Sequence, residues 1–363
     1  MRITAVEAVP VSIPYTHGGP PTGFGGAEWT QMDYLLVRID TDEGLTGWGE
    51  AFGYNCIPAT KAALERMIAP LLIGRDPAQV IQLTDELQRN LHLFGRYGVT
   101  LFAISGVDVA LWDLAAKSAG RPLAALLGGA ARDSVPAYAS LLKYRDAALV
   151  GEIASQAVAD GFTQIKVHET GEAEIAAARR AIGDDVPLMV DVNCAWSPDE
   201  ALAMAGSLAP YDLYWLEEPV WPPEDFEGLR RVREQAPMPL AAGENACTAF
   251  EFLRLLETGA VDIVQPSVTK VGGVTEFVKI LHLAATHNVR VAPHSPYFGP
   301  GLLATLQLLA TRPGIEAVEI FHLELEQDLF GGAVDVKNGR VQIPNGPGLG
   351  ADPDPQVLAR FGA

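Results

Sequence analysis

The fold is decided by residues 163–193, which read TQIKVHETGEAEIAAARRAIGDDVPLMVDVN. A short apolar run opens the stretch, a helix-like segment rich in Ala and charged residues follows, and a second apolar run closes it. Continuous apolar runs of this length suit strands that are buried on both faces, as in a parallel sheet. The stretch therefore predicts a strand–helix–strand unit with two parallel strands.

The same alternation continues to residue 321. The later apolar runs are LYWLEEP, PLAAGE, VDIVQPS, VRVAPHS and EAVEIF, with helix-like segments between them. Polar residues mark the ends of successive runs at a spacing of 24 to 27 positions, namely Lys166, Asp191, Glu217, Glu244, Lys270, His294 and Glu319. A near-constant step fits one strand, one helix and two short loops. Six such steps, with one strand before them, fill a (β/α) barrel better than an open sheet.

The N-terminal part of the chain is organised differently. Alternating, strand-like segments occupy the first fifty or so residues, and helix-like periodicity follows from about residue 57 to 118, a pattern that predicts a separate α+β domain. A Gly- and Pro-rich segment from Thr16 to Trp29 interrupts the strands. It is either a mobile connection or a lid over a site.

Composition narrows the class of protein. The chain is 48% hydrophobic and 20% charged, enough to bury a large core, and its formal net charge of −19 disfavours nucleic acid and anionic membranes as partners. Its three cysteines are widely spread and form no disulfide framework or zinc motif. We expect no signal peptide and no stretch approaching the roughly 20 uncharged apolar residues of a membrane helix. These features predict a cytoplasmic protein that binds a small molecule.

Three acidic residues, Asp191, Glu217 and Glu244, end successive predicted strands. Because functional residues of such barrels gather where the strands end, the three carboxylates are expected side by side at one mouth. Unpaired, they would repel one another strongly, and a divalent cation relieves that repulsion. Oxygen ligands without Cys or His favour Mg²⁺, or Mn²⁺, over zinc. The alternative is that these acids are solvated or paired with basic neighbours. That explanation suits a single acid better than three acids that recur at a near-constant spacing.

Candidate bases flank these acids. Lys166 and His168 are two positions apart on one strand, so both side chains project to the same face, and His294 ends a strand on the far side. Taken alone, either histidine would more often be structural or solvated. Together with a metal, they suit removal of a proton next to a carboxylate, in which the metal and a lysine stabilise the enolate and a base takes the α-proton.

At this point the residues resemble a known family. The strand-end series KVH, DVN, EEP, GEN, K-VGG and APH is similar to that of the enolase superfamily, in its mandelate racemase and muconate lactonizing enzyme branch. The segments ISGVDVALWDLAAKSAGRPLAALLGG and NGPGLG extend the resemblance over nearly the whole chain. The resemblance implies an α/β fold: a (β/α) barrel of the enolase type over residues 126–329, an N-terminal α+β capping domain over residues 1–125, and a tail, residues 330–363, that packs back on the cap.

By position, the resemblance makes Asp191, Glu217 and Glu244 the Mg²⁺ ligands and places Asn193 and Glu218 beside them. The second-strand pair in this family is usually Lys-x-Lys, whose second lysine is the base and whose first contacts the substrate carboxylate. Here the pair is Lys166 and His168, so either His168 is the base or Lys166 acts alone. Family members that use the seventh-strand histidine commonly support it with an Asp from the sixth strand. Ser267 stands there, which weakens His294 as a base and leaves it as an acid.

Further residues match positions near the family's site. Lys270 and Glu319 are two of them. The equivalent of the Gly-rich loop closes over the barrel mouth in this family and sets specificity, which makes His17, Trp29 and Tyr54 candidate substrate contacts, with packing or surface roles as the alternative.

The residues support several reactions that share abstraction of the proton α to a carboxylate. The expected one is dehydration of an acid sugar (aldonate or aldarate) to a 2-keto-3-deoxy acid, because the APHSP segment resembles acid-sugar dehydratases and Ser267 argues against a second base. The alternatives are racemisation or epimerisation of a hydroxy or amino acid derivative, such as a proline derivative, and lactone cycloisomerisation. A non-enzymatic binding role would leave the metal ligands and bases without a purpose. As in most of the family, a homo-oligomer is expected.

Overall fold

The computed structural model describes residues 1–23, 28–312 and 316–362. Within them, eight parallel strands form a barrel in the order β10-β9-β8-β7-β6-β5-β4-β11. The ring closes where the backbone N–H of Glu316 donates to the carbonyl oxygen of Val291 (3.0 Å). The strands are β4 (Ser134–Ser140), β5 (Ile165–Val167), β6 (Leu188–Asp191), β7 (Leu213–Glu217), β8 (Leu240–Ala242), β9 (Ile263–Val264), β10 (Arg290–Val291) and β11 (Val318–Phe321).

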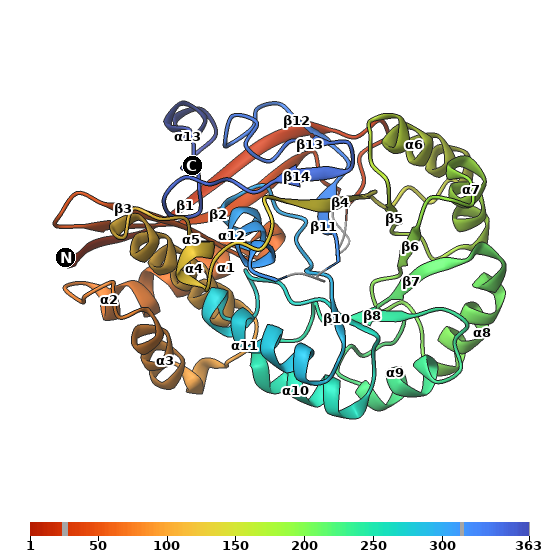
Figure 1. Cartoon of the computed structure of the whole chain (residues 1–363), viewed down its shortest axis with the longest axis horizontal. Helices are drawn as coiled ribbons and strands as arrows, with labels where there is room; N and C mark the ends of the chain where they lie inside the picture. Colours follow the sequence, from red (N-terminus) through yellow and green to blue (C-terminus); the bar gives the residue numbers. More distant parts are fainter. Residues whose placement is uncertain (24–27, 313–315, 363) are drawn as a thin grey trace.

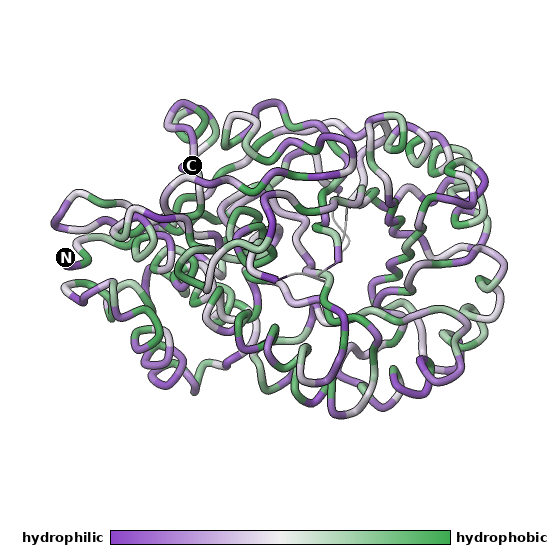
Figure 2. Tube along the Cα trace, viewed as in Figure 1, coloured by the Kyte–Doolittle hydropathy of each residue, from purple (hydrophilic) through white to green (hydrophobic). Residues whose placement is uncertain are grey.

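A helix follows each of the first seven barrel strands, and these helices form the arc around the strands in Figure 1. They are α6 (Ala147–Ala159), α7 (Glu172–Ile182), α8 (Pro198–Leu208), α9 (Phe226–Arg233), α10 (Thr248–Thr258), α11 (Gly273–Thr286) and α12 (Pro300–Ala310), with a 3₁₀ turn η4 (Ala209–Tyr211) after α8. Figure 2 shows that the outer helices alternate between hydrophilic and hydrophobic residues, as helices that cover a barrel must. The strand–helix unit predicted from residues 163–193 is therefore present as β5, α7 and β6.

The barrel interior is filled below its mouth. One buried residue from or next to each of seven strands contributes to a single apolar layer: Tyr138, Met189, Trp215, Ala241, Ile263, Ala292 and Ala317. The fifth β-strand of the chain, β5, contributes the fully buried Lys166 instead. The layer makes the barrel a packed core, so chemistry is confined to the mouth above it.

The N-terminal residues form an antiparallel sheet with helices packed on it. The sheet order is β12-β1-β2-β3, with β1 (Ile3–Thr16), β2 (Gln31–Thr41), β3 (Thr46–Ala51) and β12 (Glu324–Leu325), the last strand coming from the chain beyond the barrel. The helices are η1 (Tyr54–Cys56), α1 (Ile57–Ala63), the π-helical turn η2 (Leu64–Ile68), α2 (Ala69–Leu72), α3 (Val80–Asn90), η3 (His92–Phe94), α4 (Val99–Ser118) and α5 (Leu123–Leu126). Sheet and helices form the cap on one side of the barrel (Figure 1).

Helix α4 joins the cap to the barrel. It lies so close to β3 that a Cβ at Gly49 would be 2.0 Å from the carbonyl oxygen of Gly106, so only glycine fits at this crossing. On its other side, the buried carboxylate of Asp108 accepts hydrogen bonds from the backbone N–H and the hydroxyl of Thr275 on α11. The helix thereby fixes the cap against the barrel.

The same helix bears on one expectation. At 20 residues and a hydropathy of 1.6, α4 is long and apolar enough to cross a membrane by length and composition, but it is not an uncharged apolar stretch of the kind that the sequence was expected to lack. Its most apolar window is 78% buried inside the protein, and Asp108 and Asp113 are among its buried residues. It is apolar all round because it is covered by protein on all sides, as a core helix is.

The C-terminal tail contacts both parts of the molecule. It contains β13 (Val336–Lys337), β14 (Arg340–Gln342) and α13 (Pro355–Phe361). Strand β14 pairs antiparallel with barrel strand β4, and Gly362, just after α13, forms a bridge with Val11 of the cap sheet. The tail therefore lies on the barrel as well as on the cap.

Candidate active site

A cavity of about 760 Å³ lies at the carboxyl ends of the barrel strands, beneath the cap. The barrel contributes Lys143, Arg145, His168, Val192, Asn193, Ala195, Glu244, His294, Pro296, Glu319 and Phe321 to its lining. The cap contributes Pro21, Thr22, Gly23, Glu28, Trp29 and residues 52–56. Residues 24–27 of the Gly-rich loop lie outside the described residues. The cavity thus combines strand-end residues with a loop of the cap.

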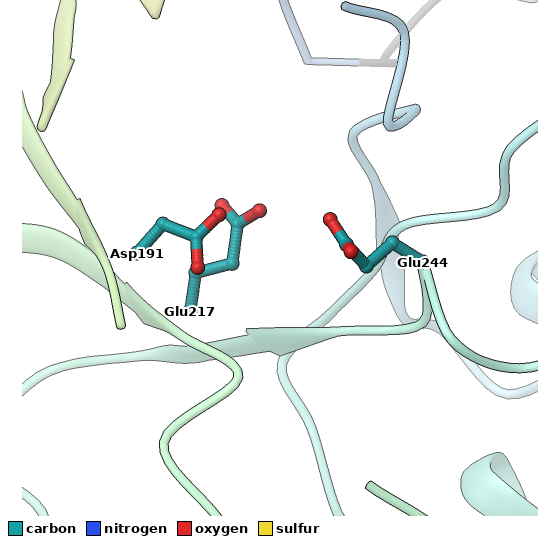
Figure 3. Close-up of side chains that lie close together, drawn as sticks. All are labelled: Asp191, Glu217 and Glu244. Atoms are coloured by element: carbon teal, nitrogen blue, oxygen red, sulfur yellow. The ribbon is translucent and has the colours of Figure 1, made fainter. Parts of the chain in front are cut away.

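Three carboxylates converge beside this cavity, and one of them, Glu244, lines it. Asp191 and Glu217 are the last residues of β6 and β7, and Glu244 lies two residues beyond β8. One oxygen of each lies within 4.8 Å of the others, and in Figure 3 the Asp191 and Glu217 carboxylates lie on one side and point toward that of Glu244. The set consists of hard oxygen donors from three neighbouring strands, which is what Mg²⁺ prefers.

The charge around the triad also fits a divalent cation. Glu218 and Glu319 bring the number of buried or nearly buried carboxylates to five, against the two lysines Lys166 and Lys270. Burial, the carboxylate of Glu244 and that of Asp191 raise the pKa of Glu218 to about 8. A divalent cation among the carboxylates removes this excess of negative charge. The residues present therefore fit the metal that the sequence predicts.

Lys166 is fully buried inside the acid cluster. Its ammonium nitrogen lies 2.8 Å from Glu217, 2.7 Å from Glu319 and 3.4 Å from Asp191. Burial opposes its charge, but these carboxylates outweigh that effect and raise its pKa well above the ordinary value. The lysine is therefore held as a cation among the acids and does not line the cavity.

His168 lines the cavity from just beyond β5. Its Nδ1 lies 2.5 Å from the backbone carbonyl oxygen of Leu141, and its Nε2 lies 3.2 Å from Asp191. Because a carbonyl oxygen only accepts hydrogen bonds, Nδ1 must carry the proton. A neutral ring then has its lone pair on Nε2, and the neighbouring Asp191 carboxylate stabilises the imidazolium that forms when Nε2 takes a proton.

His294, beyond β10, faces the cavity from the other side. Its Nε2 lies 2.9 Å from Glu244, and its Nδ1 lies 3.3 Å from the hydroxyl of Ser267 and 3.2 Å from that of Tyr297. Ser267 therefore occupies the partner position that the resemblance assigned to it, and it also bonds Tyr297. Each hydroxyl can donate or accept, so these two contacts permit either tautomer of His294, whereas the Glu244 carboxylate only accepts and favours a proton on Nε2.

Other predicted residues lie around the same cluster. Lys270 is in the turn before α11, six residues beyond the end of β9, and not at a strand end as its spacing suggested. Its ammonium nitrogen lies 3.9 Å from Glu244 and 4.7 Å from the ring centre of Phe52. The side-chain amide of Asn245 donates to Glu218 (2.7 Å), and the backbone N–H of Asn193 donates to Asp191 (2.8 Å). These contacts hold two of the acids in place.

Two of the three aromatic candidates from the cap line the cavity, and the third does not. Trp29 and Tyr54 line the cavity and stack on each other with ring centres 4.7 Å apart, and the Tyr54 hydroxyl donates to the carbonyl oxygen of Pro296. His17 is not part of this lining; its ring lies 3.2 Å from the hydroxyl of Tyr144. The structure thus brings two of the three candidates to the cavity.

Lys143, Arg145 and Tyr297 are among the lining or supporting residues that were not found from the sequence. Lys143 and Arg145 follow β4, the strand before the first quoted run, and the strand-end rule applied one strand earlier would have found them. Tyr297 lies three residues beyond His294, but its contact with that histidine depends on the loop's course.

A barrel mouth with three converging carboxylates between two imidazoles defines the class of sites that remove a proton next to a carboxylate with the help of a metal. The comparisons with known proteins agree with this class. Residues 18–128 match the mandelate racemase / muconate lactonizing enzyme N-terminal domain, and residues 149–357 match the enolase C-terminal domain-like family. The chain belongs to the enolase superfamily, in the mandelate racemase and muconate lactonizing enzyme branch.

Its relatives catalyse two of the expected kinds of reaction. A D-galactarolactone cycloisomerase of Agrobacterium fabrum is 36% identical over 90% of this chain and 91% of its own length. An arabinonate dehydratase of Saccharolobus solfataricus is 33% identical over 88% of each chain. Among solved structures, an L-talarate dehydratase of Polaromonas sp. JS666, complexed with Mg and L-glucarate, is 32% identical, with a TM-score of 0.82 over 100% of this chain and 97% of its own. This chain is therefore an enzyme of the hydro-lyase or isomerase type.

Proposed function

We propose that this enzyme removes the α-proton of an acid sugar and then eliminates the β-hydroxyl, releasing water and a 2-keto-3-deoxy acid. The observation that carries the proposal is the contrast between two histidines in one cavity. The Nδ1 of His168 faces a carbonyl oxygen, which leaves Nε2 as a base, whereas the Nδ1 of His294 faces two hydroxyls, which allow Nε2 to carry a proton. One base and one acid on opposite sides of the site are what an elimination needs.

Asp191, Glu217 and Glu244 would hold Mg²⁺, which would supply positive charge for the carboxylate oxygens as the enolate forms. His168 Nε2 takes the α-proton, and the C–H electron pair moves into the enolate. The enolate then expels the β-oxygen, and His294 gives its Nε2 proton to that oxygen, so water leaves. The remaining enol tautomerises to the 2-keto acid. Lys166 and Glu319 keep the acid cluster neutralised and in position.

Lactone cycloisomerisation is the second candidate, and the 36% identical galactarolactone cycloisomerase favours it. The same α-proton is removed, but the group expelled from the β-carbon is the carboxylate of the lactone. A carboxylate leaves without a proton, so this reaction does not need an acid at His294. A racemase needs a second base instead of an acid, and neither Ser267 nor Tyr297 forces His294 into that role.

Proton NMR in D₂O with Mg²⁺ distinguishes these three reactions, with aldonates, aldarates and their lactones as substrates. A dehydratase converts an open-chain acid to a 2-keto-3-deoxy product. In that case His168→Asn loses both α-deuteration and product, and His294→Asn keeps α-deuteration but loses product. The exposed His287, at the end of α11, provides the matched control His287→Asn. Product from lactones alone, unaffected by His294→Asn, supports the cycloisomerase, and α-deuteration without elimination supports a racemase or epimerase.

Four further properties belong to the same proposal. The catalytic unit is the barrel over residues 126–329, and residues 1–125 with the tail 330–363 form the cap. Mn²⁺ replaces Mg²⁺ in the triad with activity retained, because both are hard cations. The enzyme is cytoplasmic and forms a homo-oligomer. Turnover with each metal after chelation tests the replacement of Mg²⁺ by Mn²⁺. The mass in solution, measured by light scattering, tests the homo-oligomer.

A further inference from the structure

Two cationic side chains stand at the cavity across the mouth from Glu244. Lys143 and Arg145 follow β4 and both line the cavity. In the closed ring of strands, β4 lies four positions from β8 in either direction, so it is across the mouth from the strand that leads to Glu244. A ligand anchored at the triad therefore extends toward these two cations.

The backbone that carries them is held by specific contacts. Glu169, which is 2% exposed, accepts hydrogen bonds from the backbone N–H of Tyr144 (2.6 Å) and from that of Arg145 (3.1 Å). Arg145 has φ = +57°, in the left-handed region that side chains other than glycine rarely adopt. On the cap side, the hydroxyl of Thr22 donates to the carbonyl oxygen of Lys143. Backbone conformations of this kind persist only where surrounding contacts enforce them, and they cluster at functional sites.

The charges of the two side chains are available to a ligand. Neither Lys143 nor Arg145 forms an ion pair with any residue in the described part of the chain, although the protein carries a net charge of −19. Glu28, an exposed residue that lines the cavity from the cap, pairs with neither of them there. The charge of Lys143 acts on Glu169, but Glu169 forms no ion pair with it and instead accepts hydrogen bonds from the backbone. Two such cations at the wall of a cavity form a site for an anionic group.

We propose that Lys143 and Arg145 bind a second carboxylate, at the far end of the substrate, so that the enzyme prefers aldarates and their lactones to aldonates. This inference rests on the proposed function, in which the first carboxylate lies at the triad. The guanidinium of Arg145 matches a planar carboxylate in a paired, two-bond geometry, and Lys143 adds a point charge. An aldonate has a neutral hydroxymethyl group at this end and gains neither contact.

Matched substrate pairs test the proposal, because each pair differs only at the far end: galactarate and galactonate, glucarate and gluconate, mannarate and mannonate. We expect kcat/KM for the diacid of the accepted configuration to exceed that for its monoacid by at least 100-fold. In Lys143→Gln and in Arg145→Gln this ratio falls at least tenfold, mainly through KM for the diacid. Arg145→Lys, which keeps the charge, retains a larger part of the preference. Lys279→Gln, on the outer helix α11, is the matched control and keeps the ratio.

The outcomes separate this proposal from the proposed function. Equal kcat/KM for diacid and monoacid, or an unchanged ratio in both variants, overturns the second-carboxylate site but leaves the elimination chemistry standing. A preference for 6-phosphogluconate over glucarate shows that the cations bind phosphate, which also overturns it. If no acid exchanges its α-proton or eliminates, both the proposed function and this inference are wrong.

Discussion

The substitution Glu217→Gln tests the metal site through stability as well as activity. Glu217 is fully buried, and both of its oxygens accept hydrogen bonds, one from the ammonium of Lys166 (2.8 Å) and one from the indole N–H of Trp215 (2.8 Å). A glutamine there must turn its NH₂ group toward one of these donors. Leaving a buried donor unsatisfied costs about 1–3 kcal/mol.

The electrostatic balance acts in the opposite direction. At the 4.8 Å that bounds the separation of the triad oxygens, two carboxylates repel by about 3.5 kcal/mol with an effective dielectric constant of about 20. Glu217 has two such neighbours, and the attraction to Lys166 at 2.8 Å is about 6 kcal/mol on the same scale. Repulsion and attraction therefore nearly cancel, and burial disfavours the charge and raises the pKa of Glu217 well above its ordinary value. Neutralising the side chain relieves that burial penalty and compensates for the unsatisfied donor.

We therefore expect the metal-free variant to melt within about 3 °C of the metal-free wild type. Mg²⁺ at 100 times its dissociation constant stabilises the wild type by about 2.7 kcal/mol, or roughly 3.5 °C in a chain of 363 residues. The variant gains little of this shift, and its turnover falls by roughly 10³-fold or more, because the charge that stabilises the enolate is misplaced or lost. Differential scanning fluorimetry with EDTA and with Mg²⁺, together with initial rates, measures both effects. A variant that retains the Mg²⁺-dependent shift and the turnover refutes the assignment of Glu217 as a ligand.

Three other changes probe the surroundings of the site. Tyr297→Phe removes a hydroxyl from Nδ1 of His294 and is expected to lower kcat about tenfold without changing the Mg²⁺ concentration for half-maximal rate; an unchanged kcat contradicts it. Trp29→Ala removes a cavity wall stacked on Tyr54 and should raise KM about tenfold, which steady-state kinetics will show or disprove. Burial raises the pKa of Glu50 to about 8. Its folded-state pKa exceeds its unfolded value, so wild-type stability should fall by a few kcal/mol between pH about 4.5 and 8. Urea titrations should show a smaller fall for Glu50→Gln, because the contribution of Glu50 is removed while that of Glu218 remains; an identical pH slope in both proteins would disprove this.

The barrel and its acids were predictable because they follow from a one-dimensional pattern. Buried parallel strands require apolar runs, each crossover requires a helix, and the carboxyl ends of all strands meet at one mouth. Asp191, Glu217 and Glu244 therefore had to converge once the period was recognised, and the structure brings their oxygens within 4.8 Å.

Contacts made by loops were not predictable in this way. Lys270 shares the 26-residue step but lies in a turn, because β9 ends at Val264 and the chain continues irregularly to α11. The pairing of Tyr297 with His294 depends on the conformation of the segment after β10. The membrane-like composition of α4 arises from tertiary cover, which the periodicity of one helix cannot reveal. Local spacing determines which strand a residue ends, but not what packs against it.

The partner of His294 can therefore decide which reaction the site performs, and Ser267→Asp tests this. An Asp only accepts hydrogen bonds, so it would fix the proton on Nδ1 of His294 and leave Nε2 as a second base, whereas the hydroxyls of Ser267 and Tyr297 permit the opposite tautomer. We expect Ser267→Asp to lower the elimination rate at least tenfold while α-proton exchange in D₂O persists. Ser267→Asn controls for volume at this fully buried position, because Asn has the same shape as Asp. Its amide can donate to Nδ1, so this variant should keep a larger share of elimination. If both variants lose exchange and elimination equally, the tautomer of His294 does not control the outcome, and the position serves only to pack the loop.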